Sequence, residues 1–147
     1  MAAFLLDTNI LLRSLEPGTP EHGQVARAVS ALRLQGHTPA VTPQVLIEFW
    51  CAATRPVSVN GLGLDCGAVA DHVREILSRF PLLPDTPQVF MTWLYLADKY
   101  AVKGKRTHDT RLVAVMLAHG VENLLTFNVD DFRSFQEIKA VHPASVT

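Results

Sequence analysis

Residues 3–12 read AFLLDTNILL, and this stretch decides how the chain folds. Its apolar start, residues 3–6, predicts a short buried strand, and Thr8–Asn9 is a plausible start for a helix. Asp7 therefore stands at the carboxyl end of a buried strand, where open α/β sheets place their ligands. A charge beside a core is costly unless something pairs with it. Asp7 thus either caps a helix or holds a cation, and this stretch alone leaves both readings open.

The composition describes a globular chain with an extensive core. It has 147 residues, a formal net charge of −1 and 48% hydrophobic residues, which predicts a single domain over residues 1–147. The small net charge does not favour nonspecific attraction to nucleic acid, although a local basic patch stays open. Cys51 and Cys66 lack a pairing or metal-site spacing, so we expect reduced thiols in the core of a cytoplasmic protein. We recognise no signal peptide and no membrane span.

Helical and strand segments alternate along the chain. Helical spacing and end signals predict helices near residues 10–15, 20–35, 43–54, 65–79, 86–102 and 108–119. Short apolar runs predict strands near residues 3–6, 37–41, 80–83, 124–127 and 138–141, and the turn-rich residues 55–64 predict a surface loop. Such alternation is typical of an α/β fold with a mainly parallel sheet that helices cover on both faces.

Two of these helix starts carry the same signal. Thr42–Pro43 and Thr86–Pro87 each place a capping residue before a proline, which predicts that a helix begins at both places. Within the helices we expect Trp50 and Leu77 to face the core. Glycine-rich phosphate-binding motifs are absent from the sequence.

Acidic residues recur where strands end or helices begin. Asp7 follows the first strand, and the aspartates at 130–131 follow the strand near 124–127. Asp109 lies in the first turn of a predicted helix, and Glu48 lies within another. Strand ends and helix starts meet at one edge of a parallel sheet, so these acids can converge there. Each one alone has an ordinary explanation as a helix-dipole charge, a solvated side chain or a turn residue.

Converging carboxylates require a cation. Two like charges about 4 Å apart repel by roughly 4 kcal/mol at an effective dielectric constant near 20. A cluster therefore raises its pKa values or recruits cations. Oxygen ligands alone suit Mg²⁺ or Mn²⁺ rather than Zn²⁺, and no set of His and Cys residues competes for the site. Such an ion activates a bound water and stabilises charge on a phosphoryl oxygen, which is the chemistry of phosphodiester hydrolysis.

Four pieces of the sequence, in this order, resemble the PIN domain family. They are LLDTNIL at 5–11, Glu48 in the second long helix, HDTRLVA at 108–114 and LTFNVDDF at 125–132. The similarity is greatest to the VapC-type toxins of bacterial toxin–antitoxin pairs. The resemblance implies a three-layer α/β/α sandwich with a mainly parallel central sheet, and a Mg²⁺- or Mn²⁺-dependent endoribonuclease that cleaves RNA.

The resemblance also implies partners for the chain. VapC-type proteins usually form homodimers, and a small antitoxin protein silences them. We expect the same here, without a membrane partner. The candidate contact regions are the loop 55–64 and the helices near 25–32 and 65–79.

The family's catalytic and metal-binding residues carry over to Asp7, Glu48 and Asp109. Asp131 is the expected fourth carboxylate, sharing its corner with Asn128, because many PIN domains carry an acid where this chain has Asn128. The lost charge leaves open whether one or two metal ions bind. In this reading Asp7 and Asp109 hold the metal, while Glu48 positions or deprotonates the attacking water.

Neighbouring residues are expected to support this site. Thr8 and Asn9 would orient Asp7, and Thr126 would do the same near Asp131, because ligating carboxylates commonly need such hydrogen bonds. Arg111 is the first candidate for contact with RNA. The other local basic candidates are Arg13, Arg55, Lys103, Lys105 and Arg106.

Two rival functions share part of this pattern. An aspartate-nucleophile phosphatase also begins with an acid after a buried strand, but it requires a second acid two residues later, and Asn9 stands there. A degenerate PIN fold that binds RNA or a partner without cleavage is the other rival. The acids at 7, 48 and 109 count against full degeneration, whereas Asn128 keeps that reading open.

Overall fold

The computed structural model describes residues 2–147, so Met1, which the predicted domain includes, lies outside the described residues. The helices are α1 (Thr8–Arg13), α2 (Pro20–Leu34), α3 (Pro43–Thr54), α4 (Cys66–Arg79), α5 (Val89–Lys99), α6 (Arg106–Ala118) and α7 (Val129–Phe132). The strands are β1 (Ala3–Leu6), β2 (Thr38–Ala40), β3 (Asn123–Leu125) and β4 (Lys139–Val141), and the short 3-10 turns are η1 (Val57–Val59) and η2 (Pro143–Ser145).

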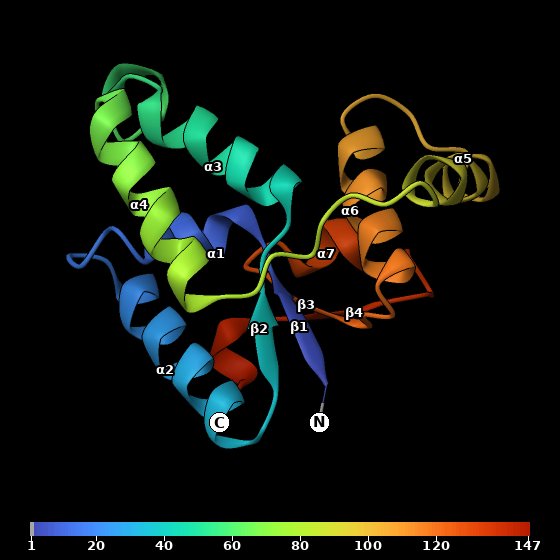
Figure 1. Cartoon of the computed structure of the whole chain (residues 1–147), viewed down its shortest axis with the longest axis horizontal. Helices are drawn as coiled ribbons and strands as arrows, with labels where there is room; N and C mark the ends of the chain where they lie inside the picture. The colour runs from blue at the N-terminus through green and yellow to red at the C-terminus, as the bar shows by residue number, and fades with distance from the viewer. Residues whose placement is uncertain (1) are drawn as a thin grey trace.

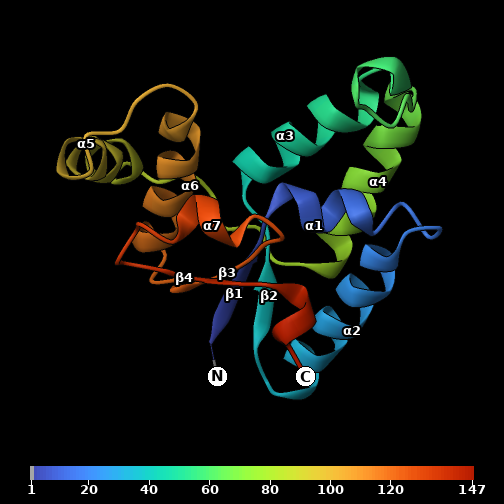
Figure 2. The same ribbon diagram turned by 180° about the vertical axis from the view of Figure 1, so that it is seen from behind.

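The four strands form one sheet in the order β2-β1-β3-β4, and every pairing is parallel. Helices α1–α4 lie on one side of the sheet and α5–α7 on the other, as both views show (Figures 1 and 2). The predicted α/β/α sandwich is therefore confirmed. The carboxyl end of β1 and the starts of α3 and α6 gather at the same edge of the sheet (Figure 1).

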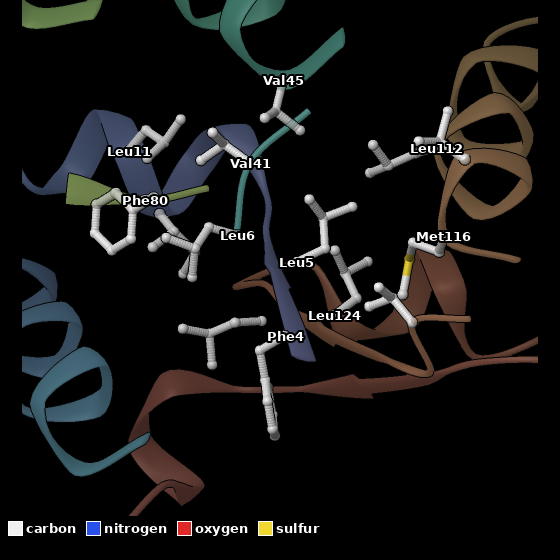
Figure 3. Packing of buried hydrophobic residues seen from close by; sticks show 14 of the residues in the cluster. Phe4, Leu5, Leu6, Leu11, Val41, Val45, Phe80, Leu112, Met116 and Leu124 are labelled. Atoms are coloured by element: carbon white, nitrogen blue, oxygen red, sulfur yellow. The ribbon is translucent and has the colours of Figure 1, made fainter. Parts of the chain in front are cut away.

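The central strand β1 is buried from both faces, which explains its unbroken apolar sequence. Leu5 points toward Leu112 and Met116 on α6, whereas Leu6 points to the opposite side, toward Phe80 (Figure 3). Successive side chains of a strand alternate between its faces, so β1 joins the two helical layers into one hydrophobic cluster. This packing fixes where β1 ends and hence where Asp7 lies.

One of the two predicted Thr-Pro helix starts is confirmed. The Thr42 hydroxyl accepts a hydrogen bond from the Val45 N–H at 3.2 Å, and Pro43 is the first residue of α3. The prediction at Thr86–Pro87 is wrong, because α5 begins only at Val89 and no side chain caps it. A turn comes first there: the Thr86 carbonyl accepts from the Val89 N–H at 3.1 Å, while the Thr86 hydroxyl caps nothing.

Four side chains that we expected in the core are exposed: Cys51, Cys66, Trp50 (38%) and Leu77 (42%). On α3 the buried positions include Val45, Phe49 and Ala53, at intervals of four residues. Trp50 and Cys51 follow Phe49 directly, so the helix turns them away from the core. On α4 the buried residues are Val69 and Ile76, and Cys66 lies at the exposed first turn.

Residues 80–83 do not form a regular strand. They make a single parallel bridge, between Val41 and Leu82, with hydrogen bonds from Val41 N–H to the Pro81 carbonyl and from Leu83 N–H to the Val41 carbonyl. Pro81 has no N–H to donate, which limits any longer ladder. Within residues 2–147, every helix is too short or too polar to cross a membrane.

Candidate active site

Asp7 occupies the junction between β1 and α1. Its N–H donates to the Leu125 carbonyl at 3.0 Å, which extends the pairing of β1 with β3 by one residue. Its side chain accepts from the Thr8 N–H at 2.7 Å and thereby caps α1. The carboxylate is only 7% exposed and lies at the carboxyl edge of the sheet. Asp7 is thus a helix cap that also stands where a ligand would bind.

A network of hydrogen bonds holds the other oxygen of Asp7. The Thr126 hydroxyl donates to Asp7 Oδ2 at 2.7 Å and accepts from Asn9 Nδ2 at 3.2 Å and from the Asn128 N–H at 3.0 Å. Asn9 Nδ2 also lies 3.4 Å from Asp7 Oδ2, and Asn9 Oδ1 accepts from the Phe127 N–H at 3.2 Å. We expected Thr126 to support the site near Asp131, but its hydroxyl orients Asp7 instead.

Glu48 faces Asp7 from α3 and is held at both oxygens. The Thr8 hydroxyl donates to Glu48 Oε2 at 3.1 Å, and Gln44 Nε2 donates to Glu48 Oε1 at 2.9 Å. This contact joins α3 to α1 and brings Glu48 close to Asp7. The Thr8 N–H also donates to Asp7, so this one residue forms hydrogen bonds with both acids.

Gln44 is a site residue that the sequence did not reveal. Its Nε2 donates to the His108 carbonyl at 2.8 Å as well as to Glu48, and its Oε1 accepts from Arg111 Nη1 at 2.9 Å. The amide is buried and joins α3 to the start of α6. One signal in the sequence could have indicated this role: Gln44 lies four residues before Glu48, and residues four apart share one face of a helix.

Asp109 lies in the first turn of α6, as predicted. Burial raises the pKa of its carboxyl to about 6, and repulsion from Asp131, Asp7 and Glu48 acts in the same direction, while Arg106 opposes it. The four acids therefore share one electrostatic field.

Burial also raises the pKa of Asp7. The hydrogen bonds from Thr126 and Thr8 oppose this shift, and repulsion from Glu48 and Asp131 adds to it. Hydrogen bonds to a carboxylate favour its charged form, whereas neighbouring carboxylates disfavour it. Asp7 is thus a buried acid that no salt bridge within the described part of the chain, residues 2–147, compensates.

The remaining acidic corner lies on α7. Asp130 is exposed and forms a surface ion pair with Arg133 at 2.9 Å. Asp131 is also exposed, yet it contributes to the raised pKa values of Asp7 and Asp109. Asn128 precedes α7 and contacts the network through its backbone N–H. Asp131 is thus the carboxylate of this corner whose charge acts on Asp7 and Asp109.

The donor set fits a hard divalent cation by its chemistry. All four side chains offer carboxylate oxygens, and no salt bridge among residues 2–147 neutralises any of them. The buried, unpaired Asp7 carboxylate is what a cation would compensate. Across the same residues, no three acids, histidines or cysteines surround one point closely enough to form a finished metal cage.

The basic candidates are mostly engaged. Arg111 pairs with Asp85 at 3.1 Å in addition to its bond to Gln44. Arg106 donates to Ser134 at 2.6 Å. The other candidates divide into two kinds: Arg13 pairs with Glu16 and Arg55 contacts Cys51, whereas Lys103 and Lys105 are exposed in the loop before α6.

A hollow of about 720 Å³ lies elsewhere, between α1, α2 and α4. It contains none of the four acids. We therefore locate the candidate active site by its carboxylates and not by the size of a cavity.

Comparison with known proteins identifies relatives along nearly the whole chain. Residues 4–138 match the family described as PIN domain. Ribonuclease VapC24 of Mycobacterium tuberculosis is 30% identical over 133 residues, which is 88% of this chain and 89% of that protein.

Solved structures with the same fold include two VapBC proteins. VapBC2 from Rickettsia felis, bound to a DNA fragment from its promoter, has a TM-score of 0.72 at 14% identity and covers 95% of this chain and 98% of that one. VapBC-1 from nontypeable Haemophilus influenzae has a TM-score of 0.72 at 17% identity, with coverage of 96% and 98%. At these identities the likeness shows the fold alone.

Proposed function

This chain belongs to the PIN domain family. On that premise we propose that it is an endoribonuclease. Its active site, which cleaves RNA phosphodiester bonds, consists of Asp7, Glu48, Asp109 and Asp131. One observation carries the proposal: four acids from separate elements influence one another's charge, and the most buried of them, Asp7, has no salt-bridge partner among residues 2–147. The 30% identical relative is named as a ribonuclease, which supports the same reaction.

Asp7 and Asp109 are the residues that would hold Mg²⁺ or Mn²⁺, with Asp131 as a further ligand. When bound, such an ion lowers the pKa of a coordinated water and stabilises negative charge on phosphoryl oxygens. The carboxylates favour these hard ions because their oxygens are hard ligands. Arg106, which lowers the pKa of Asp109, offsets only part of the repulsion in the cluster.

Glu48 takes the role of positioning and deprotonating the attacking water. Thr8 and Gln44 each donate to one of its oxygens, which restricts the direction in which the carboxylate can accept a proton. Thr126 and Asn9 restrict Asp7 in the same way. These hydrogen bonds pre-organise the site, so little reorganisation is needed when substrate binds.

We also propose that the chain is the toxin of a toxin–antitoxin pair that acts on RNA in the cytoplasm, forms a homodimer and is silenced by a small antitoxin protein. Two of the structural relatives are VapBC proteins, which supports the pairing. Two of the three predicted contact regions, near 25–32 and 65–79, border the 720 Å³ hollow between α1, α2 and α4. This hollow is the first place to seek the antitoxin.

Purified protein, structured RNAs and divalent metals test the proposed reaction. Wild-type protein should cleave RNA with Mg²⁺ or Mn²⁺ and lose cleavage in a chelator. Asp7→Asn should lose activity by at least about 100-fold while keeping its fold, because it removes a ligand charge and relieves repulsion. The matched control is Asp130→Asn, an exposed acid of the same region, which should cleave like wild type. Equal cleavage by wild type and Asp7→Asn would overturn the proposal.

A further inference from the structure

A hollow of about 480 Å³ opens beside the acid cluster, between the starts of α5 and α6. Val89, Phe90 and Trp93 line it from α5, and His108 and Arg111 line it from α6. We refer to it as the aromatic hollow. His108 directly precedes Asp109 in the chain, and its carbonyl accepts from the same Gln44 amide that holds Glu48. None of the four acids lines the aromatic hollow, but Gln44 and His108 connect its wall to the candidate active site.

The aromatic wall of this hollow offers an open stacking surface. The rings of Phe90 and Trp93 are stacked, with centroids 5.9 Å apart and an interplanar angle of 24°. Trp93 is fixed, because its Nε1–H donates to the Thr107 carbonyl at 2.9 Å. Phe90 is 62% exposed, so the protein covers less than half of it. Aromatic rings placed in this way bind flat, unsaturated groups such as nucleobases.

Polar groups stand opposite this wall. Asp85 and Arg111 pair at 3.1 Å, and both remain partly exposed. Thr86 lines the same hollow, although its hydroxyl is itself buried and has no hydrogen-bond partner among residues 2–147. A nucleobase presents both donors and acceptors along its edge, which the partly exposed Arg111 guanidinium and Asp85 carboxylate can satisfy. The combination of an aromatic face and a mixed polar edge suits a base better than a purely apolar side chain.

We propose that the aromatic hollow binds a nucleobase: an unpaired base of the RNA strand stacks on Phe90 while a neighbouring phosphate lies at the acid cluster. The size of the hollow falls within the range of small-ligand pockets. The role of this base in substrate selection rests on the proposed ribonuclease function. Binding of the base itself can be measured without any cleavage.

The competing occupant is another protein surface, because α5 also exposes Met91, Leu94 and Tyr95. Phe90 and Met91 are neighbours of similar exposure, 62% and 63%, but only Phe90 lines the hollow. A protein interface along α5 would use both side chains. A base in the hollow would use Phe90 alone, so the two residues form a matched pair.

The test is a titration of the four ribonucleoside 5′-monophosphates into the full chain, followed by NMR of the two indole N–H signals. Trp93 lies in the hollow, whereas Trp50 lies on α3 outside it and serves as an internal reference. We expect at least one nucleotide to shift the Trp93 signal and to leave that of Trp50 unchanged. Shifts of neither signal, or equal shifts of both, would overturn the proposal.

Two variants complete the test. Phe90→Ala should weaken nucleotide binding at least about fivefold, because base–aromatic stacking is lost, whereas Phe90→Tyr and Met91→Ala should bind like wild type. If Phe90→Ala and Met91→Ala instead change the oligomeric state alike in sedimentation and leave nucleotide binding intact, the surface is a protein interface and the proposal is wrong. Nucleotide binding by a chain that cleaves no RNA would overturn the ribonuclease function alone.

Discussion

The acid cluster has two halves that are held very differently. In the tied half, Asp7 and Glu48, every carboxylate oxygen accepts a hydrogen bond from a neighbouring residue. In the open half, Asp109 and Asp131, the carboxylates accept no hydrogen bond from any residue between 2 and 147. Both halves carry the same chemical group at the same edge of the sheet. They differ in the neighbours that the fold supplies.

This difference separates positioning from charge. Hydrogen bonds from Thr126 and Thr8 fix Asp7 and offset part of its burial cost. Asp109 has no such compensation, and burial with repulsion raises its pKa to about 6. The tied half is therefore held in place by hydrogen bonds, whereas the open half is not. In the part of the chain that the structure describes, the four acids influence one another's charge without forming a finished cage.

Breaking the tied half should have the largest effect on stability. Thr126→Val removes the buried donor to Asp7, and it also removes the acceptor of the Asn128 N–H and one of the two acceptors of the Asn9 amide. We expect the free energy of unfolding to fall by about 1–3 kcal/mol, the usual cost of unsatisfied buried polar groups. Denaturant unfolding measures it. Thr126→Ser keeps the hydroxyl and should lose clearly less, and equal losses for both variants would contradict the role of the hydrogen bond.

A substitution of Gln44 tests how Glu48, the other acid of the tied half, is positioned. Gln44→Leu should lower kcat for RNA cleavage about tenfold with little change in KM, because Glu48 loses one of its two orienting donors. Unfolding curves recorded beside the kinetics separate positioning from folding. A loss that appears only in KM, or that follows the fraction of unfolded protein, would show that Gln44 does not position Glu48.

Removing a charge from the open half should raise the free energy of unfolding instead of lowering it. Asp109→Asn should stabilise the metal-free protein at pH 7, by an amount on the order of 1 kcal/mol, since the partly exposed carboxyl is screened by solvent. Thermal unfolding in a chelator measures this gain. The control is Asp130→Asn, which loses only an exposed ion pair and should change stability little. A destabilised Asp109→Asn protein would mean that repulsion does not dominate the open half.

The pH dependence of that gain is the smallest predicted effect. The folded-state pKa of Asp109, about 6, lies above its ordinary value of 3.8. Well below pH 3.8 the carboxyl is protonated in both folded and unfolded chains. Between pH 3.8 and about 6 the unfolded chain ionises while the folded chain keeps its proton, so the wild type loses stability, and above about pH 6 this loss levels off. The difference between Asp109→Asn and wild type should therefore vanish below about pH 3, grow up to about pH 6 and stay constant toward pH 7. Glu137 has a lowered pKa, so its contribution to stability changes with pH in the opposite direction. Both proteins contain Glu137, so its contribution cancels when their stabilities are subtracted. A difference that does not depend on pH would contradict the prediction.

The sequence predicts the scaffold of the tied half well. A strand buried on both faces leaves an unbroken apolar run, so residues 3–6 and the position of Asp7 follow directly. The cap at Thr42 locates the start of α3 and, with it, Glu48. These signals are local, which is why they can be read without knowledge of the fold.

Long-range partners could not be predicted in the same way. Thr126 bonds to Asp7 across 119 residues, and Gln44 bonds to the His108 carbonyl across 64. Nothing in the local pattern around either residue encodes those contacts. The exposure of Trp50 was also hidden, because most residues from 45 to 53 are apolar and the pattern does not single out one face of α3.

Direct binding of Mn²⁺ tests most simply whether the two halves form one cation site. The measurement is calorimetric titration of Mn²⁺ into metal-free wild type, Asp7→Asn, Asp109→Asn and the control Asp130→Asn. We predict that wild type and Asp130→Asn bind alike, and that losing an acid from either half weakens binding by at least about tenfold. Binding that is equal in all four proteins, or absent from wild type, would contradict the convergence of these acids on one cation.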